Sequence, residues 1–308
     1  MTQAILLVLG GLVLLTVAAD RFVVSAVRLA RHWGMSSLLV GAVVVGMGTS
    51  LPELFVSISG GLDSFDLGVG NITGSNIANL TLVLGVAVII SPVGGSASLV
   101  RQEGLLTFVA MALFGIFLWD GTLSRFEGIV LLVAMVVALY RLFHLESSKK
   151  DALAAVKEVD EAEGHVWAEV GIALATLAAT LLGANWLTDG ALLVADEFGL
   201  SEGFVGNTLV AIGTSLPELA AAVAAARRRE NDLILGNLLG SNVFNSLLVA
   251  GALGVTTAGT LVEPAQVTIG FMMAAIVLAG LFAARDSISR LEGTVLLGTY
   301  GAFIWLGF

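Results

Sequence analysis

The sequence LVGAVVVGMGTSLPEL at residues 39–54 recurs as FVGNTLVAIGTSLPEL at residues 204–219, with ten of 16 aligned positions identical. A second pair follows at nearly the same spacing, GNITGSNIAN at 70–79 and GNLLGSNVFN at 236–245. The offset is 165 residues for the first pair and 166 for the second. Two long matches at nearly the same spacing indicate that the chain is a duplication of a single structural unit.

The composition of the chain restricts what this duplicated unit can be. Of the 308 residues, 57% are hydrophobic and only 12% are charged, against a usual charged share of about 25%. That is too little charge to cover a soluble domain of this size. It therefore excludes an ordinary soluble enzyme, a nucleic-acid-binding protein and a disordered protein. The sequence predicts an all-α polytopic membrane protein whose surroundings are the lipid bilayer.

Charge and residue types narrow the chemistry further. A formal net charge of −10 argues against any polyanionic partner, nucleic acid included. The absence of cysteine excludes disulfides, thiolate metal sites and cysteine catalysis. The three histidines lie in or beside polar stretches, which argues against an imidazole metal site inside the membrane. We expect no cofactor, and nothing in the sequence indicates an obligate protein partner.

Apolar runs separated by short polar breaks predict ten membrane-spanning helices. Several of these runs are long enough to cross about 30 Å of hydrocarbon at 1.5 Å per residue. The predicted spans are 4–20, 37–60, 68–90, 104–119, 124–143, 166–188, 203–226, 233–255, 265–284 and 288–307.

The basic residues support this count and predict an orientation. With ten spans, 13 of the 14 Lys and Arg fall in the odd-numbered loops, and Arg125 alone falls in an even-numbered loop. Basic loops stay on the cytoplasmic side, so both termini are expected to face outward. The mixed-charge stretch 144–165 is predicted to be a cytoplasmic linker. We expect the protein in the inner membrane of a prokaryote.

The duplication and the span count together predict an inverted repeat. Each unit carries five spans, and two copies of an odd-span unit must have opposite orientations in the membrane. The expected organisation is an N-terminal five-helix repeat at 1–143 with its motif at 39–80, the linker at 144–165, and a C-terminal five-helix repeat at 166–308 with its motif at 204–246. Inverted repeats are typical of secondary transporters, whose substrates bind near the midplane where the repeats meet.

Glu53 and Glu218 are the acidic residues that the predicted spans place deep in the bilayer. An ionised carboxylate there costs at least about 2.5–3.5 kcal/mol. A lone intramembrane Glu could be protonated and make one interhelical hydrogen bond. Two such residues in the same motif, brought together by inversion, favour a binding site instead.

The neighbours of these glutamates are of the kind that binds cations. Hydroxyls precede each Glu by three and four residues, so in a continuous helix Thr49, Ser50 and Glu53 would share one face, as would their counterparts in the second repeat. Each motif also holds a proline that, in the middle of a helix, would free the carbonyl four residues back, here that of Gly48 or Gly213. In the second motif, serine and asparagine recur four residues apart, beside glycines that helix packing alone could explain. The set offers carboxylate, hydroxyl, amide and carbonyl oxygens without sulfur or imidazole, which suits Ca²⁺, Na⁺ or Mg²⁺.

These motifs resemble the two repeats of the sodium/calcium exchanger family, within the calcium/cation antiporter superfamily. The resemblance rests on GTSLPE in each half followed by GSNIAN and GSNVFN, and covers essentially the whole chain. It implies an antiporter that exchanges Ca²⁺ for Na⁺ by alternating access, with ions bound between the second, third, seventh and eighth helices while the first and sixth slide across that core. It also leaves H⁺ or K⁺ open as coupled ions.

Carried over by motif, the resemblance implies a metal-binding set divided evenly between the repeats. The implied ligands are Thr49, Ser50, Glu53, Ser75 and Asn79, then Thr214, Ser215, Glu218, Ser241 and Asn245, with the carbonyls of Gly46 and Ala211. Asn245 is a departure, because some exchangers have Asp there. The site therefore has two acidic groups, and the sodium stoichiometry of the family does not transfer directly.

Two other interpretations remain open at this point. The proton/calcium branch shares the scaffold, although it usually shows an Asn-containing GNxxE pattern where this chain has GTSLPE. An intramembrane enzyme or a passive channel would be a different class. The sequence contains no HExxH motif, no paired Asp within the spans and no Cys, so we predict a transporter and no catalytic residues.

Overall fold

The computed structural model describes residues 2–94, 97–154, 166–197, 211–262, 265–285 and 287–306. Within these ranges the chain consists of helices, four strands of two residues each, and the short turns that connect them. The elements of the first half are α1 (Thr2–His32), α2 (Ser37–Val40), η1 (Gly41–Gly46), α3 (Met47–Thr49), α4 (Leu51–Asp63), α5 (Phe65–Ala78), η2 (Asn79–Val83), α6 (Leu84–Ile90), β1 (Val93–Gly94), α7 (Ala97–Phe117), β2 (Thr122–Leu123) and α8 (Arg125–Ala154).

The second half repeats this order. Its elements are α9 (Val166–Glu197), α11 (Ala211–Thr214), α12 (Leu216–Arg228), α13 (Asn231–Phe244), η4 (Asn245–Val249), α14 (Ala250–Thr257), β3 (Gly259–Thr260), α15 (Gln266–Ala283), β4 (Ser287–Ile288) and α16 (Arg290–Leu306). Here η marks a π-helical segment, in which the backbone hydrogen bonds reach one residue further than in an α-helix.

Every predicted span corresponds to helical structure within the described residues. By length and composition, seven helical stretches in these ranges could cross a membrane, and Gln102–Phe117 is a shorter apolar helix. The first span is longer than predicted, since α1 continues through Arg21 and Arg28 to His32. Likewise α8 continues through 144–154, the beginning of the predicted linker. The rest of that linker, 155–165, and the start of the seventh span, 203–210, lie outside the described residues.

The second and seventh spans are broken rather than continuous. Ser50 (φ −85°, ψ 10°) separates α3 from α4, and Ser215 (φ −87°, ψ 4°) separates α11 from α12. Pro52 and Pro217 are each the second residue of the following helix. Our expectation of a mid-helix proline was therefore wrong. At these positions proline costs no helical hydrogen bond, because first-turn amides have no partner within the helix.

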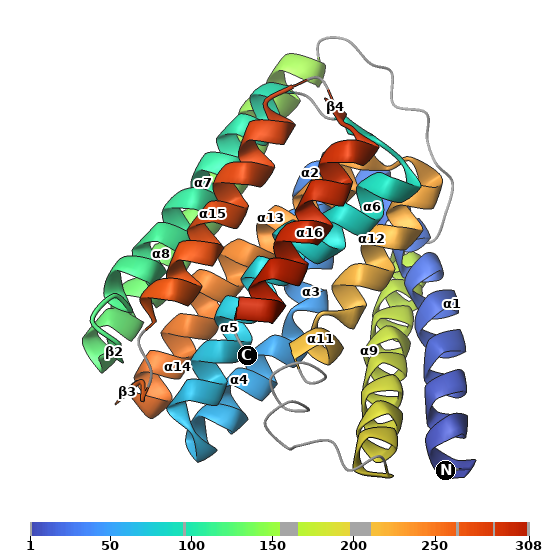
Figure 1. Cartoon of the computed structure of the whole chain (residues 1–308). Helices are drawn as coiled ribbons and strands as arrows, with labels where there is room; N and C mark the ends of the chain where they lie inside the picture. Colours follow the sequence, from blue (N-terminus) through green and yellow to red (C-terminus); the bar gives the residue numbers. More distant parts are fainter. Residues whose placement is uncertain are drawn as a thin grey trace.

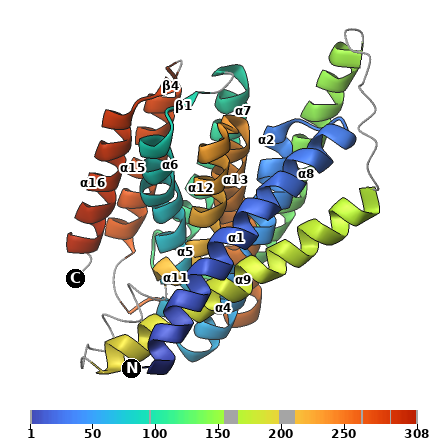
Figure 2. The same ribbon diagram turned by 90° about the vertical axis from the view of Figure 1, so that its right-hand side faces the viewer.

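Two small antiparallel sheets relate the halves. Strand β1 pairs with β4 through Val93 and Ile288, and β2 pairs with β3 through Leu123 and Gly259. The repeat offset converts β1 into β3 and β2 into β4, so the two sheets are copies of each other. They lie at opposite ends of the helices (Figures 1 and 2). This placement is what an inverted repeat requires.

Helices α1 and α9 form a long pair along one side of the molecule (Figure 2). Glycine allows their close approach: a Cβ on Gly11 would lie 2.6 Å from the Leu187 amide nitrogen, and one on Gly183 would lie 2.6 Å from that of Leu15. The exposed face of α1 is apolar, with Leu6 and Val13 about two-thirds exposed (67% and 64%). Such a face suits contact with lipid.

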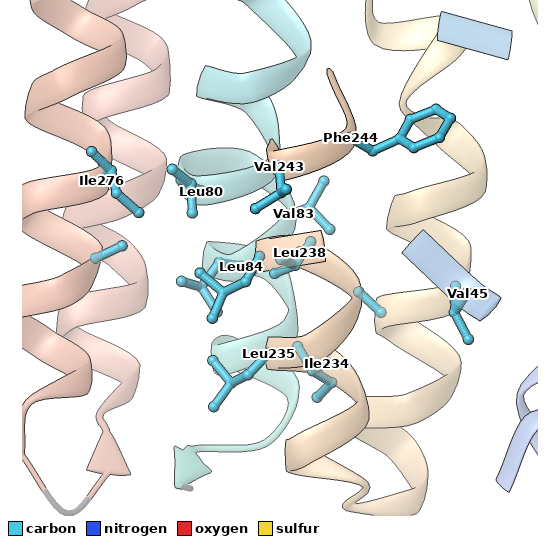
Figure 3. Close-up of a cluster of buried hydrophobic side chains, with 14 of the residues drawn as sticks. Val45, Leu80, Val83, Leu84, Ile234, Leu235, Leu238, Val243, Phe244 and Ile276 are labelled. Atoms are coloured by element: carbon cyan, nitrogen blue, oxygen red, sulfur yellow. The ribbon is translucent and has the colours of Figure 1, made fainter. Parts of the chain in front are cut away.

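The interior of the molecule is formed by α13 and the segments around it. The backbone of α13 contacts α2 and η1, and α7 and α12 also pack against this helix. An apolar cluster fills this region (Figure 3) and includes Val45, Leu80, Val83, Leu84, Ile234, Leu235, Leu238, Val243, Phe244 and Ile276. This packing holds α13 and η4, which carry predicted ligands, in a fixed place.

Candidate cation-binding site

The two carboxylates meet at the helix breaks. Glu53 lies in the first turn of α4 and Glu218 in the first turn of α12, and both are fully buried at 0% exposure. Each receives a hydrogen bond from the serine at the break of the other repeat: Ser50 Oγ donates to Glu218 Oε1 at 2.9 Å, and Ser215 Oγ donates to Glu53 Oε1 at 3.4 Å. Helix N-termini also favour negative charge. The breaks thus place both acidic groups in polar surroundings.

Each glutamate keeps one oxygen available. Glu53 Oε2 and Glu218 Oε2 are buried and have no hydrogen-bond partner among the described residues. Buried polar atoms normally find partners, and each one that does not requires an explanation. Two such carboxylate oxygens in one buried cluster are the donor atoms that a bound cation would satisfy.

The sequence motif suggested that Thr49, Ser50 and Glu53 share one helix face. The break changes this, because the serine hydroxyl reaches the opposite repeat rather than its own glutamate. The threonine hydroxyl of each repeat likewise contacts a residue of the opposite repeat. Thr49 Oγ1 lies 3.4 Å from Asn237 Oδ1, and Thr214 Oγ1 donates to Asn71 Oδ1 at 3.1 Å.

Asn71 and Asn237 were not among the predicted site residues. Besides contacting Thr214, Asn71 donates through Nδ2 to Ser57 Oγ at 2.9 Å and to the Glu53 carbonyl at 3.3 Å. Both asparagines follow the first glycine of the repeated GNxxGSN motif, so their recurrence was a signal in the sequence. Their role here is to fix the segments that carry the glutamates.

Asn79 and Asn245 each begin a π-helical segment, η2 and η4. Both side chains are fully buried. Asn79 Nδ2 donates to Asn242 Oδ1 at 3.3 Å, whereas neither side-chain polar atom of Asn245 has a hydrogen-bond partner in the described part of the chain. Single π-turns are common at functional sites, and here they coincide with two predicted ligands.

The remaining predicted ligands lie in the same cluster or beside it. Ser75 Oγ lies 3.3 Å from Ser215 Oγ, and Ser241 Oγ donates to the Gly46 carbonyl at 3.2 Å. A Cβ on Gly46 would lie 3.0 Å from the Asn237 carbonyl oxygen, so this residue must be small. Ala211 begins α11, and its side chain lies outside what the structure describes.

Glu53 and Glu218 are the acidic groups of this cluster. No group of three or more His, Cys, Asp or Glu that could hold a metal ion occurs among the described residues. The acceptors around the glutamates are hydroxyl and amide oxygens. The arrangement therefore suits a hard cation that binds several neutral oxygens and two carboxylates.

An inverted pair of broken helices with a buried two-carboxylate site defines a secondary cation transporter. The family model described as "Sodium/calcium exchanger protein" matches residues 3–144 and 168–308. The chain therefore belongs to the sodium/calcium exchanger family of cation/Ca²⁺ exchangers and is a membrane transporter, not an enzyme.

Individual relatives match along nearly the whole chain. The chain is 35% identical to the "Inner membrane protein YrbG" of Escherichia coli, covering 99% of this chain and 96% of that protein. It is 34% identical to the "Putative antiporter CaxA" of Alkalimonas amylolytica, covering 100% and 99%. It is also 29% identical to the "Sodium/calcium exchanger MaX1" of Methanosarcina acetivorans, covering 98% of each.

A solved structure shows the same fold. The sodium-calcium exchanger NCX_Mj, soaked with Na⁺ and Sr²⁺, superimposes with a TM-score of 0.86 at 31% identity and covers 99% of this chain and 98% of its own. The same exchanger without Na⁺ and Ca²⁺ gives a TM-score of 0.86 as well. The predicted fold of ten spanning helices in two inverted repeats is thereby confirmed.

Proposed function

We propose that this protein exchanges Ca²⁺ for Na⁺ across the inner membrane of a prokaryote, binding both ions at the cluster around Glu53 and Glu218. The observation that carries this proposal is the pair of buried carboxylates, each with one oxygen lacking a partner among the described residues. Similarity to exchangers named for sodium and calcium supports the choice of ions.

The charge of the cluster explains how it can bind either Ca²⁺ or Na⁺. Two ionised glutamates carry −2, which one Ca²⁺ or two Na⁺ neutralise. Either load leaves little net charge in a region of low dielectric, where an uncompensated charge costs several kcal/mol. Exchange of one load for the other is therefore possible without a large electrostatic barrier.

The ligand set of this proposal is the one implied by the two motifs. In the first repeat the ligands are the hydroxyls of Thr49, Ser50 and Ser75 and the amide of Asn79. In the second repeat they are the side chains of Thr214, Ser215, Ser241 and Asn245. The set is completed by the carbonyls of Gly46 and Ala211. The Asn245 amide and the two carboxylate oxygens, which lack hydrogen-bond partners among the described residues, support this assignment most directly.

In this proposal, alternating access is a movement of two outer helices across a packed core. The ligands lie on the segments from η1 to η2 and from α11 to η4, which the apolar cluster holds together. The outer pair α1 and α9 packs through glycines. We propose that this pair moves across the core, with both termini outside and residues 144–165 in the cytoplasm.

Cysteines placed at Ser148 and Ser64 would test the orientation, because the first should be labelled only from the cytoplasm and the second only from outside.

Counterflow of ⁴⁵Ca²⁺ in proteoliposomes tests the function, with Na⁺, K⁺ and pH gradients imposed in turn. Ca²⁺ uptake should follow an outward Na⁺ gradient and should saturate. Uptake driven by a pH gradient in the absence of Na⁺ would establish H⁺ coupling on the same scaffold instead. Ca²⁺ flux without any counter-ion requirement would contradict an antiporter.

A further inference from the structure

A pocket lined by arginines opens at the end of the molecule that the basic residues predict to be cytoplasmic. Its volume is about 510 Å³, and its polar lining comprises Ser91, Arg227, Arg229, Asn231 and Arg290. These residues come from three places in the sequence: the end of α6, the junction of α12 and α13 with the helix ends on either side of it, and the start of α16. It is separate from the buried cluster of ligands.

The three arginines of this pocket have no acidic partner in the described part of the chain. The ion pairs found there join Arg21 and Arg28 to Glu169, Arg228 to Asp20, and Arg285 to Glu292. Glu230 and Asp232 belong to the same turn but do not line the pocket. Three guanidinium groups thus surround one cavity without a compensating carboxylate in its lining.

Helix dipoles explain only part of this arrangement. Arg227 lies in the last turn of α12, where a cation is favoured. Arg290 is the first residue of α16, where a cation is disfavoured, and the nearby Glu292 carboxylate bonds instead to Arg285 at 2.8 Å and to Ser289 Oγ at 2.9 Å. Arg290 therefore faces the pocket against the local electrostatic preference, and a bound anion would reverse that cost.

We propose that this pocket binds a phosphate-bearing anion. Guanidinium groups match phosphate oxygens in paired hydrogen bonds, and the amino-terminal ends of α13 and α16 add favourable dipoles. Asn231 Oδ1 is buried without a hydrogen-bond partner among the described residues, and it would accept from a hydroxyl on the phosphate ester. Basic pockets between membrane helices on the cytoplasmic side are suited to lipid headgroups, and a soluble phosphate offers the same chemistry.

Native mass spectrometry of the purified protein tests this binding without any transport measurement. The wild type should retain phosphatidylglycerol at least tenfold more than phosphatidylcholine. The variant Arg227→Gln/Arg229→Gln/Arg290→Gln should lose this preference. Arg228→Gln is the matched control, because Arg228 lies between two pocket residues, pairs with Asp20 at 2.6 Å and does not line the pocket. It should keep the preference.

Two further arms identify the source and guard against misfolding. Millimolar inorganic phosphate that displaces the lipid indicates a soluble ligand, and lipid retained in its presence indicates a headgroup site. The single variant Arg290→Gln, checked by size-exclusion chromatography, should weaken retention at least threefold. Equal retention by the wild type and the folded triple variant would overturn the proposal, as would a wild type that binds neither phosphatidylglycerol nor phosphate.

Discussion

The two halves of the ligand cluster have nearly the same sequence but different hydrogen bonds. Glu218 receives its serine hydrogen bond at 2.9 Å, whereas the equivalent bond to Glu53 is 3.4 Å, and Ser215 Oγ also lies 3.3 Å from Ser75 Oγ. The reciprocal pattern is preserved, but the two glutamates are not held equally.

The asparagines differ more clearly. Asn79 donates to Asn242, while the reverse pair of Asn245 and Asn76 is not formed, and Asn76 donates to Ser246 Oγ at 2.9 Å instead. An inverted-repeat transporter opens to one side at a time, so its two halves must have different conformations in any single state. In the proposed alternating-access cycle, the unequal hydrogen bonds would be the local form of that difference.

The largest expected effect comes from the carboxylates, where the halves should behave alike. Glu53→Gln and Glu218→Gln should each reduce Ca²⁺ uptake in proteoliposomes at least ~100-fold, since leaving a buried charge without its partner costs about 3–5 kcal/mol. Glu292→Gln is the control, because Glu292 also lies in the first turn of a helix but outside the cluster. Normal uptake in either test variant would remove that glutamate from the site.

Replacing the serine at each helix break should weaken Ca²⁺ binding by different amounts in the two halves. Ser50→Ala removes the shorter bond to a carboxylate, and a hydrogen bond to a charged group is worth about 1.5–3 kcal/mol, so half-saturating Ca²⁺ should rise roughly tenfold or more. Ser215→Ala removes a longer bond and should raise it only a few-fold. The measurement is Ca²⁺ dependence of uptake in the two variants. The reverse order would show that the unequal distances do not govern ion binding.

Replacing the two supporting asparagines, Asn71 and Asn237, should destabilise the protein by different amounts. Asn71→Ala removes the hydrogen bonds of Asn71 to Ser57, the Glu53 carbonyl and Thr214, and should lower the free energy of unfolding by about 3 kcal/mol. Asn237→Ala affects the contact with Thr49 and should cost about 1 kcal/mol. Denaturation by SDS in bicelles would measure both. Equal losses would mean that the additional bonds of Asn71 contribute nothing.

The sequence predicted the fold well because its signals are strong and independent. Span length, the distribution of basic residues and the duplicated motifs each restrict the topology, and they agree. The boundaries were less predictable. Helix α1 continues past Arg21 because its polar end is stabilised by ion pairs with α9, such as Arg28 with Glu169 at 2.5 Å, and no local pattern shows such a contact.

The site was predictable in its residue types but not in its pairings. Repetition identified Glu53 and Glu218, yet a periodicity argument assumed a continuous helix and placed Ser50 beside the glutamate of its own repeat. The break at Ser50 turns that hydroxyl toward Glu218. Backbone dihedrals at a single residue decide this, and Asn71 was overlooked because its partners lie on distant segments.

The smallest expected effect concerns the asparagines that begin the π-segments. The paired glutamates supply the whole negative charge of the site, so a third Na⁺ would leave a positive excess in a region of low dielectric. Asn245→Asp adds a carboxylate where the amide has no partner among the described residues. It should lower half-saturating Na⁺ for Ca²⁺ release about fivefold, an effect of roughly 1 kcal/mol, and raise the Hill slope from near two toward three.

Asn79→Asp is the matched control, because it places a carboxylate against Asn242 Oδ1 and loses a hydrogen bond, so it should not lower half-saturating Na⁺. Both variants should be measured at several pH values, so that the protonation of the new carboxylate is controlled. If Asn245→Asp has the half-saturation, Hill slope and pH response of the parent, position 245 lies outside the ion site, and the difference between the two halves has no bearing on sodium stoichiometry.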